Sequence, residues 1–563
     1  MKSSALPLLD VRRLCVSFPG AAKPVVNGVS FRLERGKALG IIGESGSGKT
    51  LTGLALSGLL PGRANILPGT EIRFKGRSLC SLTFSQWQTL RGKEIGLVFQ
   101  EPMSSLNPLM RVGDQVRESV VRNGNTEILS KQSALARTES LFEEVGLEFS
   151  PSALRAYPHE YSGGMQQRVM IAMALAGNPS LLIADEPTSS LDVTVESQIL
   201  KVLKEAQERR SMAMIFISHD LDIVASLTHD VLVMRQGICE EYGPLGKVFS
   251  FPSADYTSFL LRHRLCVELS PKPDLTLKHF SLNKNDPAAP AEEAIGAPVV
   301  VLRARNASIG YAGGMLADPH TVLRNVNLEL RQGKCLGIVG ESGSGKSTLV
   351  KAVMGMAKLL AGDIELFGRN LREMRPAEKR AASKRCQLIF QNTYSALNPR
   401  LPVKTILAEP LRVHGLPCPA ERIRTMLEEV GLREIHAEAY PHQLSGGQRQ
   451  RVNIARALAL DPEIILCDEI VSALDVSVQS QILHLLREIK DRRGMSLLFI
   501  SHDLRVIRHM ADDVLVLKSG EVVEVGPVGE IWARPKTSYT RLLFSSTPGT
   551  VRVPPELDKV SNL

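Results

Sequence analysis

The chain has 563 residues, which is too long for a single hydrophobic core and indicates at least two domains. Hydrophobic residues make up 44% and charged residues 23% of it, as in an ordinary soluble globular protein. The net charge of +9 is a mild excess for this length, so charge alone argues against nucleic-acid binding. A generally solvated basic surface explains it better, and attraction to an anionic membrane face also fits.

The eight cysteines contain no CxxC pair, which gives poor support for a zinc or iron–sulfur site. They do not resemble a disulfide framework, so we expect a reducing cytoplasm. Residues 1–10 lack the apolar core of a signal peptide, and no apolar run approaches the roughly 20 residues that span a bilayer. Any passage through a membrane would therefore need other subunits.

A glycine-rich loop is the first element with clear chemistry. Residues 39–42 predict a buried strand, residues 43–50 (Gly-Glu-Ser-Gly-Ser-Gly-Lys-Thr) form the loop, and a helix should begin near Leu51. Glycines let backbone N–H groups turn toward a phosphate, and the helix N-terminus adds its positive end. We expect Lys49 to reach the terminal phosphates and the Thr50 hydroxyl to bind Mg²⁺.

Later elements of the first half place polar side chains where strands end or a helix begins. Gln100 and His219 each follow an apolar strand, Asp185 and Glu186 end a buried strand, and a Ser-Gly-Gly turn at residues 162–164 opens a helix. Alone, each side chain is more often a surface or structural group. Beside a phosphate loop, we expect Asp185 to complete the Mg²⁺ shell and Glu186 to orient or deprotonate the attacking water. Gln100 and His219 should contact the γ-phosphate.

The second half repeats these elements in the same order, with its helix expected near Leu349. The loop lysine returns 297 residues later, whereas the Ser-Gly-Gly turn, the acidic pair and the histidine all return after 283. Length changes therefore fall between the loop and the turn, and the fixed spacing indicates that both copies work. The repeated residues are Lys346, Ser347, Gln391, Ser445, Asp468, Glu469 and His502.

The sequence predicts domains at residues 8–265 and 299–550, joined by a linker at 266–298. Most of the linker is Pro/Ala/Asn-rich and weakly hydrophobic, without a long charged helix or heptads.

Together these motifs resemble the ABC ATPase family over nearly the whole chain outside the linker and tails. Residues 444–448 (Leu-Ser-Gly-Gly-Gln) match its signature peptide, and residues 161–165 are a variant. The resemblance implies an α/β fold of two tandem ABC-type P-loop ATPase domains. Each would have a RecA-like α/β core, an antiparallel β subdomain and a helical subdomain. It also implies ATP and Mg²⁺ as cofactors and a head-to-tail pairing of the domains, in which the signature helix is a second anion-binding N-terminus.

Position by position, the resemblance implies two composite ATP sites, each made of one half's phosphate loop and the other half's signature. The first half contributes Gly43, Glu44, Ser45, Gly46, Ser47, Gly48, Lys49 and Thr50, and the signature residues Ser162, Gly163 and Gly164. The second half contributes Gly340, Glu341, Ser342, Gly343, Ser344, Gly345, Lys346, Ser347 and Thr348, and Ser445, Gly446, Gly447 and Gln448. The catalytic residues would be Gln100, Glu186, His219, Gln391, Glu469 and His502. The Mg²⁺ ligands would be Thr50, Gln100, Asp185, Ser347, Gln391 and Asp468. Phe18 and Tyr311 would stack on adenine, although an aromatic there is as often a core residue.

Finer sequence resembles the importers of peptides, nickel and related solutes. This resemblance rests on the stretches after each glutamine, on residues 162–170 and on the tail elements at 251–257 and 534–540. This resemblance implies two transmembrane permeases and an extracytoplasmic solute-binding protein as partners, at the cytoplasmic face of the inner membrane, without nucleic acid. ATP binding would close the domains and move the permeases through residues 101–114 and 392–405, and hydrolysis would reopen them. Dipeptides, oligopeptides, glutathione, nickel and metal–opine complexes all remain open as solutes.

Three positions depart from the family pattern: Met165 for Gln, Ser190 for Ala, and Ile470 for the Pro found at Pro187. Because proline restricts the residue before it to extended conformations, we expect Glu469 to be less firmly placed. The resulting hypothesis is slower hydrolysis in the second site.

Three other classes of ATPase share some of these features. A soluble tandem ABC ATPase acting on the ribosome usually has a long charged helical linker, and a DNA-repair ATPase needs a long coiled coil between its motifs. The motor of an exporter is usually fused to membrane spans.

Overall fold

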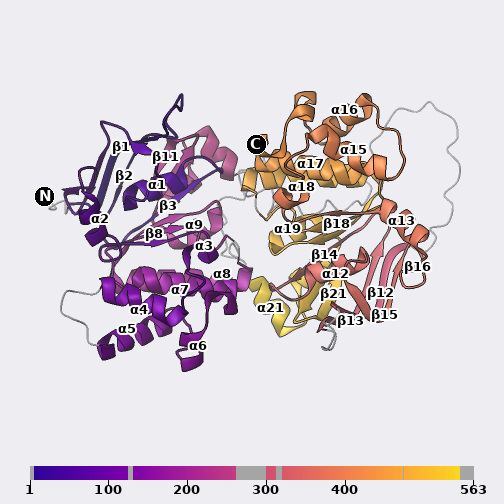
Figure 1. Cartoon of the computed structure of the whole chain (residues 1–563), viewed down its shortest axis with the longest axis horizontal. Coiled ribbons are helices and arrows are strands. Elements are labelled where there is room, and N and C mark those ends of the chain that lie inside the picture. Colours follow the sequence, from indigo (N-terminus) through magenta and orange to yellow (C-terminus); the bar gives the residue numbers. More distant parts are fainter. Residues whose placement is uncertain are drawn as a thin grey trace. The chain divides into compact units, whose positions relative to one another are not determined.

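The computed structural model describes residues 6–123, 131–189, 191–261, 299–311, 320–472 and 474–545. The chain divides into two compact units, one within residues 1–264 and one within residues 265–547 (Figure 1). The expected linker at 266–298 lies outside the described residues, and the domain boundaries stay predictions.

The first unit contains a mixed six-stranded sheet of order β11-β10-β3-β9-β8-β7, parallel except for the edge strand β11, and a smaller antiparallel sheet around β1. Its strands are β1 (Leu9–Ser17), β2 (Val26–Leu33), β3 (Ala38–Gly43), β4 (Asn65–Ile66), β5 (Glu71–Phe74), β6 (Arg77–Ser78), β7 (Ile95–Val98), β8 (Leu181–Asp185), β9 (Ala213–Ile217), β10 (Asp230–Arg235) and β11 (Ile238–Pro244). Its helices include α1 (Lys49–Ser57), α2 (Phe84–Leu90), α3 (Pro102–Ser105), α4 (Val112–Asn123), α5 (Lys131–Glu144), α6 (Pro151–Arg155), the 3-10 helix η1 (Pro158–Glu160), α7 (Gly163–Leu175), α8 (Val193–Arg210), α9 (Leu221–Leu227) and α10 (Leu245–Ser250).

The second unit repeats this topology, with a six-stranded sheet of order β17-β18-β19-β14-β20-β21 and an antiparallel sheet of order β13-β12-β15-β16. Its strands are β12 (Val300–Tyr311), β13 (His320–Arg331), β14 (Cys335–Gly340), β15 (Lys358–Leu366), β16 (Arg369–Asn370), β17 (Cys386–Ile389), β18 (Ile464–Asp468), β19 (Ser496–Ile500), β20 (Asp513–Lys518) and β21 (Glu521–Pro527). Its helices include α12 (Lys346–Val353), α13 (Pro376–Arg385), α14 (Thr393–Ala396), α15 (Val403–Val413), α16 (Ala420–Glu429), the 3-10 helices η2 (Glu434–Glu438) and η3 (Pro441–Gln443), α17 (Gly446–Leu458), α18 (Val476–Arg493), α19 (Leu504–Met510), α20 (Val528–Ala533) and α21 (Ser538–Ser545).

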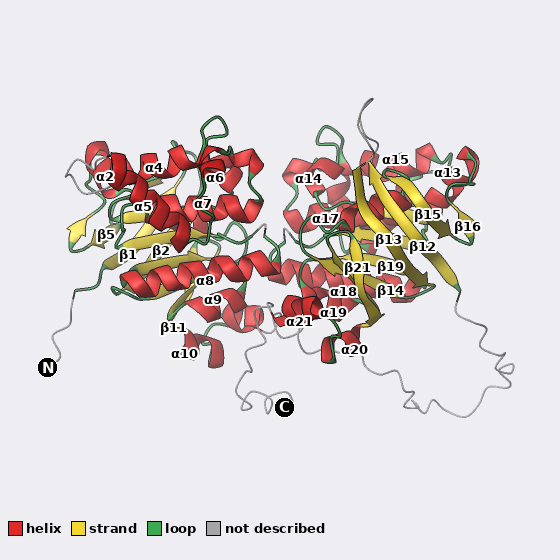
Figure 2. Ribbon diagram, turned by 90° about the horizontal axis from the view of Figure 1, so that it is seen from below, coloured by secondary structure: helices red, strands yellow, loops and turns green. Residues whose placement is uncertain are grey.

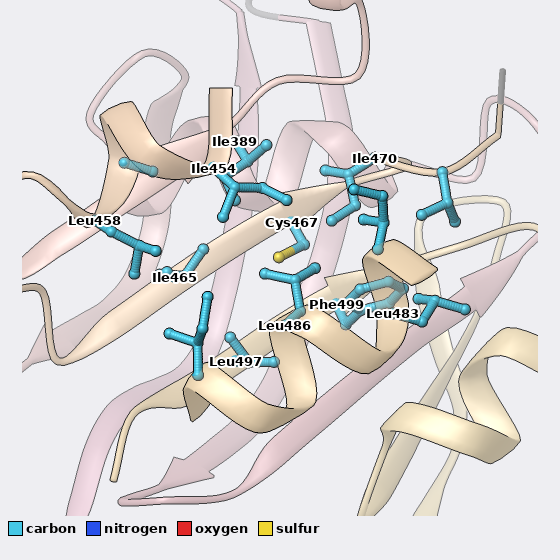
Figure 3. Packing of buried hydrophobic residues seen from close by; sticks show 14 of the residues in the cluster. Ile389, Ile454, Leu458, Ile465, Cys467, Ile470, Leu483, Leu486, Leu497 and Phe499 are labelled. Carbon is cyan, nitrogen blue, oxygen red and sulfur yellow. The ribbon is translucent and has the colours of Figure 1, made fainter. Parts of the chain in front are cut away.

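Burial explains these layers. The central parallel strands are apolar along almost their whole length because helices and the small sheet cover both faces. In the second unit, α17 and α18 pack on β18 and β19 through Leu486, Cys467, Phe499 and their neighbours (Figure 3). Helices α4, α5, α6 and α7 gather in a layer of their own (Figure 2). The predicted α/β class and its three parts in each unit are confirmed.

The two phosphate-loop helices begin earlier than expected. We predicted starts near Leu51 and Leu349, but α1 begins at Lys49 and α12 at Lys346. The preceding glycines take left-handed N-cap conformations, which lets each lysine be the first helical residue.

Candidate functional site

The first phosphate loop leaves the carboxyl end of β3 and is shaped by close backbone packing. A Cβ at Gly43 would lie 2.1 Å from the carbonyl oxygen of Met234, so only glycine fits there. Lys49 Nζ donates to the carbonyl oxygens of Gly43, at 2.7 Å, and Glu44, at 2.9 Å. Among the residues that the structure describes, none forms a hydrogen bond with the buried hydroxyl of Ser47. A cation held over turned backbone and an orphaned hydroxyl fit a phosphate group.

The second phosphate loop has the same geometry at the end of β14. A Cβ at Gly340 would lie 2.2 Å from the carbonyl oxygen of Leu517. Lys346 Nζ donates to the carbonyl oxygens of Gly340, at 2.8 Å, and Glu341, at 2.9 Å. Ser344 Oγ is buried and, within the described part of the chain, has no hydrogen-bond partner, like its counterpart in the first loop. Both halves therefore carry a complete phosphate cradle.

Each cradle is joined to a buried aspartate by the hydroxyl that follows the lysine. Thr50 Oγ1 donates to Asp185 Oδ1 at 3.3 Å, and Ser347 Oγ donates to Asp468 Oδ1 at 2.9 Å. Burial raises the pKa of Asp185 to about 6, although the hydrogen bond from Thr50 opposes it, and the charge of Glu186 raises it further. Burial likewise raises the pKa of Asp468. Hydroxyl and carboxylate oxygens are the ligands that a hard cation such as Mg²⁺ prefers. A bound cation would also stabilise the ionised form of each buried aspartate.

The next residue in the first half, Glu186, meets two other predicted side chains. Gln100 Nε2 donates to Glu186 Oε2 at 2.9 Å, and His219 Nδ1 lies 3.2 Å from Glu186 Oε1. Burial alone would raise the pKa of Glu186, but the hydrogen bond and charge of His219, with the charge of Lys49, lower it. The carboxylate is therefore ionised and can accept a proton from water.

The second half repeats the cluster around Glu469. Gln391 Nε2 donates to Glu469 Oε2 at 2.7 Å, and His502 Nδ1 lies 3.7 Å from the same oxygen. Burial would raise the pKa of Glu469, but His502 and Lys346 lower it. These residues follow the carboxyl ends of the neighbouring parallel strands β17, β18 and β19, which is the usual place of ligand sites in such sheets.

Both glutamates have left-handed backbones, which contradicts the premise of the slower second site. The φ angle is 43° at Glu186 and 47° at Glu469, so Pro187 does not hold its neighbour extended. In each half the glutamate N–H donates to the last residue of the adjacent strand, at 2.9 and 3.1 Å. Ile470 is only 3% exposed and packs into the core, which holds that backbone instead (Figure 3). Strain at matched positions is typical of functional residues.

The signature serines are helix N-caps. Ser162 Oγ accepts the N–H of Met165, and Ser445 Oγ accepts the N–H of Gln448, both at 3.3 Å. Gln448 Oε1 also accepts the N–H of Ser445 at 3.0 Å, which completes a capping box. Met165 cannot make that return bond, so the first signature turn is held by one hydrogen bond fewer. The paired glycines form the first turn of α7 and α17, where free N–H groups can face an anion.

Four predicted positions receive no decisive support. Phe18 is partly buried against the core of the small sheet, and Tyr311, at the end of β12, is 40% exposed. Adenine stacking by either ring stays a prediction. Ser190, one of the three departures from the family pattern, and Ala473, its counterpart 283 residues later, lie outside the described residues.

Two tyrosines of the tail elements contact the phosphate loops, which the sequence reasoning missed. Tyr256 Oη accepts the N–H of Glu44, and Tyr539 Oη accepts the N–H of Glu341, both at 3.3 Å. Their recurrence at matched positions in both halves was the available signal.

Comparisons with known proteins agree with this geometry. The sequence model of the ABC transporter family matches residues 26–189 and 323–472. The chain belongs to the ABC transporter family. Among ABC transporter components, it is 39% identical to the glutathione import ATP-binding protein GsiA of Salmonella typhimurium (strain LT2) and of Escherichia coli (strain K12). Each alignment covers 96% of this chain and 89% of the relative.

The ABC relatives confirm the predicted fused ATP-binding subunit and its ATPase function as a motor of solute import, and they do not favour the ribosomal or exporter alternatives. A solved dimer of the ATP-binding cassette MJ0796, bound to ADP and Pi, matches 40% of this chain and 98% of its own with 31% identity and a TM-score of 0.37. Among the described residues, none of the helices is long and apolar enough to cross a membrane. An ABC ATP-binding subunit of this kind implies membrane permeases as partners.

Proposed function

We propose that the chain hydrolyses ATP at two sites and thereby drives uptake of a peptide-like solute, with glutathione as the first candidate. The observation that carries the ATPase part is the duplicated cluster of a phosphate loop, a hydroxyl–aspartate pair and a glutamate bonded by glutamine and near histidine. The name of the GsiA relatives supports the solute. The residues found here do not bear on nickel, which stays a prediction.

In each half, the loop lysine would shift from its carbonyl partners to the terminal phosphates, because an anion is a stronger partner than a neutral carbonyl. The residues that would hold Mg²⁺ are Thr50, Gln100 and Asp185, and Ser347, Gln391 and Asp468. The metal, when bound, would neutralise phosphate charge. Glu186 and Glu469 would accept the proton of the attacking water, while Gln100 and Gln391 fix their carboxylates.

The signature helices would complete the sites. We propose that α17 faces the first phosphate loop and α7 the second, in a head-to-tail pairing of the domains. The free N–H groups of a helix N-terminus and its positive end support an anion-binding role for each. His219 and His502 would then sense the γ-phosphate from the side of their own loops.

Two membrane permeases and an extracytoplasmic solute-binding protein are the proposed partners. The segments at 101–114 and 392–405 follow the glutamines, so a change at the phosphate can be passed to a docked permease helix. Exposed apolar side chains there, Met103 at 63% and Leu109 at 88%, support docking. The chain would sit peripherally at the cytoplasmic face of the inner membrane and would not contact the solute.

The test combines ATPase and uptake measurements on the full chain with its permeases. The double variant Glu186→Gln, Glu469→Gln should lower steady-state ATP turnover by at least about 100-fold, the effect of losing a general base. ATP binding should persist, and uptake of labelled glutathione should stop. Glu208→Gln, an exposed helix carboxylate outside the cluster, is the control and should change neither. If the unmodified chain with its permeases hydrolyses ATP but takes up no glutathione, the result would contradict the proposed solute and leave the proposed ATPase function intact.

A further inference from the structure

A basic cavity lies in the first unit, apart from the phosphate loop. Its volume is about 800 Å³, and its walls come mainly from α2, α5, the last residues of α8 and the chain that follows α7. Neither the loop nor the acidic pair lines it. Five cationic side chains face two carboxylates there: Arg77, Lys93, Arg137, Arg209 and Arg210 against Glu94 and Glu144.

Both carboxylates are already engaged. Glu144 accepts from Arg210 Nε at 3.1 Å, and Glu94 accepts from Ser180 Oγ at 2.9 Å and pairs with Lys75, which is not a lining residue. Among the described residues, Arg77, Lys93 and Arg137 therefore have no carboxylate within ion-pair distance. The cavity holds a genuine excess of positive charge.

The second unit has an acidic residue at a position where the wall of the cavity in the first unit has an amide. Arg422, the counterpart of Arg137 on α16, lies 3.7 Å from Asp461, which also accepts from Arg493 Nη1 at 2.8 Å. Asn178 takes the place of this aspartate in the first unit. Both residues follow the signature helix with left-handed backbones, φ 56° and 51°. The first unit thus carries an amide where the second carries an acid.

The other wall shows the same exchange. Glu378, third residue of α13, accepts a hydrogen bond from Arg369 of β16. The equivalent residue of α2 is Gln86, which faces the cavity with Arg77 of β6. These two acid-to-amide differences leave Arg137 and Arg77 without the acidic partners that Arg422 and Arg369 have in the second unit.

A third difference leaves the charge excess in place. Arg385 pairs with Glu463 in the second unit, where the first unit has Glu94 and Ser180. In the second unit Glu463 balances the charge of Arg385, and in the first unit Lys75 balances the charge of Glu94. Burial lowers the pKa of Arg137, and the charge of Arg210 lowers it further, which together outweigh the opposing effect of the Glu144 carboxylate.

We propose that this cavity binds a small molecule with two or more anionic groups of the phosphate or carboxylate kind. Guanidinium groups bind such oxygens through paired N–H donors, and two arginines without an acidic partner among the described residues, Arg77 of β6 and Arg137 of α5, both line the cavity. The volume suits a small metabolite. The inference rests on the cavity alone and is independent of the transported solute.

The test is calorimetric titration of the full chain, at fixed ionic strength, with pyrophosphate and separately with tricarballylate. Lys49→Ala and Lys346→Ala are included to remove pyrophosphate binding at the phosphate loops. We expect about one equivalent of saturable binding, and the probe that binds identifies the anionic group. Asn178→Asp, which restores the acid of the second unit, should weaken binding about 10- to 100-fold, the effect of losing one charge-assisted hydrogen bond.

Arg137→Gln should weaken binding to the same extent, whereas the matched control Arg422→Gln in the second unit should not change it. Asn178→Asp should keep or raise the melting temperature, because it adds a partner for Arg137, so loss of binding cannot reflect unfolding. The proposal would be overturned if neither probe bound saturably. It would also be overturned if a probe bound the Asn178→Asp variant as tightly as it binds the chain that keeps Asn178.

Discussion

At the scale of single residues, the tail tyrosines connect distant sequence to the phosphate loops. The contact from Tyr256 to the N–H of Glu44 joins residues 212 positions apart, and Arg235 lies 4.8 Å from the ring centre. Tyr539 repeats this arrangement beneath Lys518, at 4.9 Å. Each hydroxyl therefore fixes a loop N–H from outside the nucleotide cradle and acts as a positioning residue.

We predict that Tyr256→Phe raises the KM for ATP about two- to tenfold, the effect of one neutral hydrogen bond, with kcat little changed. Steady-state kinetics over a range of ATP concentrations measure this split. Tyr242→Phe is the control, because its hydroxyl bonds the backbone of Arg32 instead. A lowered melting temperature with an unchanged KM would show that Tyr256 is only structural.

At the scale of elements, a glutamate of β11 anchors the start of the tail segment that carries Tyr256. Glu241 Oε1 accepts from the N–H of Ser253 at 3.0 Å and from its hydroxyl at 2.8 Å, and Oε2 accepts from the N–H of Ala254 at 3.2 Å. Burial would raise the pKa of Glu241, but these hydrogen bonds outweigh it and lower the pKa. The ionised carboxylate is thus favoured by folding.

The stability from Glu241 should be complete above its ordinary pKa of 4.5 and be lost as pH falls through the lower folded value. We predict that Glu241→Gln lowers the free energy of unfolding by about 1 kcal/mol at pH 7. The difference in free energy of unfolding between Glu241→Gln and the unmodified chain should become smaller as pH approaches about 4. Urea unfolding at both pH values measures it, with the neighbouring Glu240→Gln as control. A gap independent of pH would contradict the ionic origin.

At the scale of the whole molecule, the two halves present matched clusters of glutamate, glutamine and histidine despite the difference between Pro187 and Ile470. Because Glu186 and Glu469 share a left-handed backbone, we predict similar residual rates in the single variants Glu186→Gln and Glu469→Gln, within about threefold in single-turnover ATP hydrolysis. The remaining activity reports the intact site in each case. A residual rate at least about tenfold lower for Glu186→Gln would restore the slower second site.

The sequence located the phosphate loops because their chemistry is local. A phosphate loop needs its glycines, lysine and hydroxyl within a few residues, and fixed spacing exposed the rest of the repeat. The left-handed backbone of Glu186 was not predictable, because a following proline argues for an extended one. The contact of Tyr256 was missed because it depends on the packing of segments far apart in sequence.

The presence of both units on one chain has a consequence for cellular supply. Each polypeptide made carries one copy of each ATPase unit, so the ratio of the two units stays fixed whatever the level of expression. Neither half can accumulate alone as an idle ATPase. A sequence change confined to one half, such as Asn178 where the second half has Asp461, is inherited together with the other half. The two halves can therefore specialise without separate regulation.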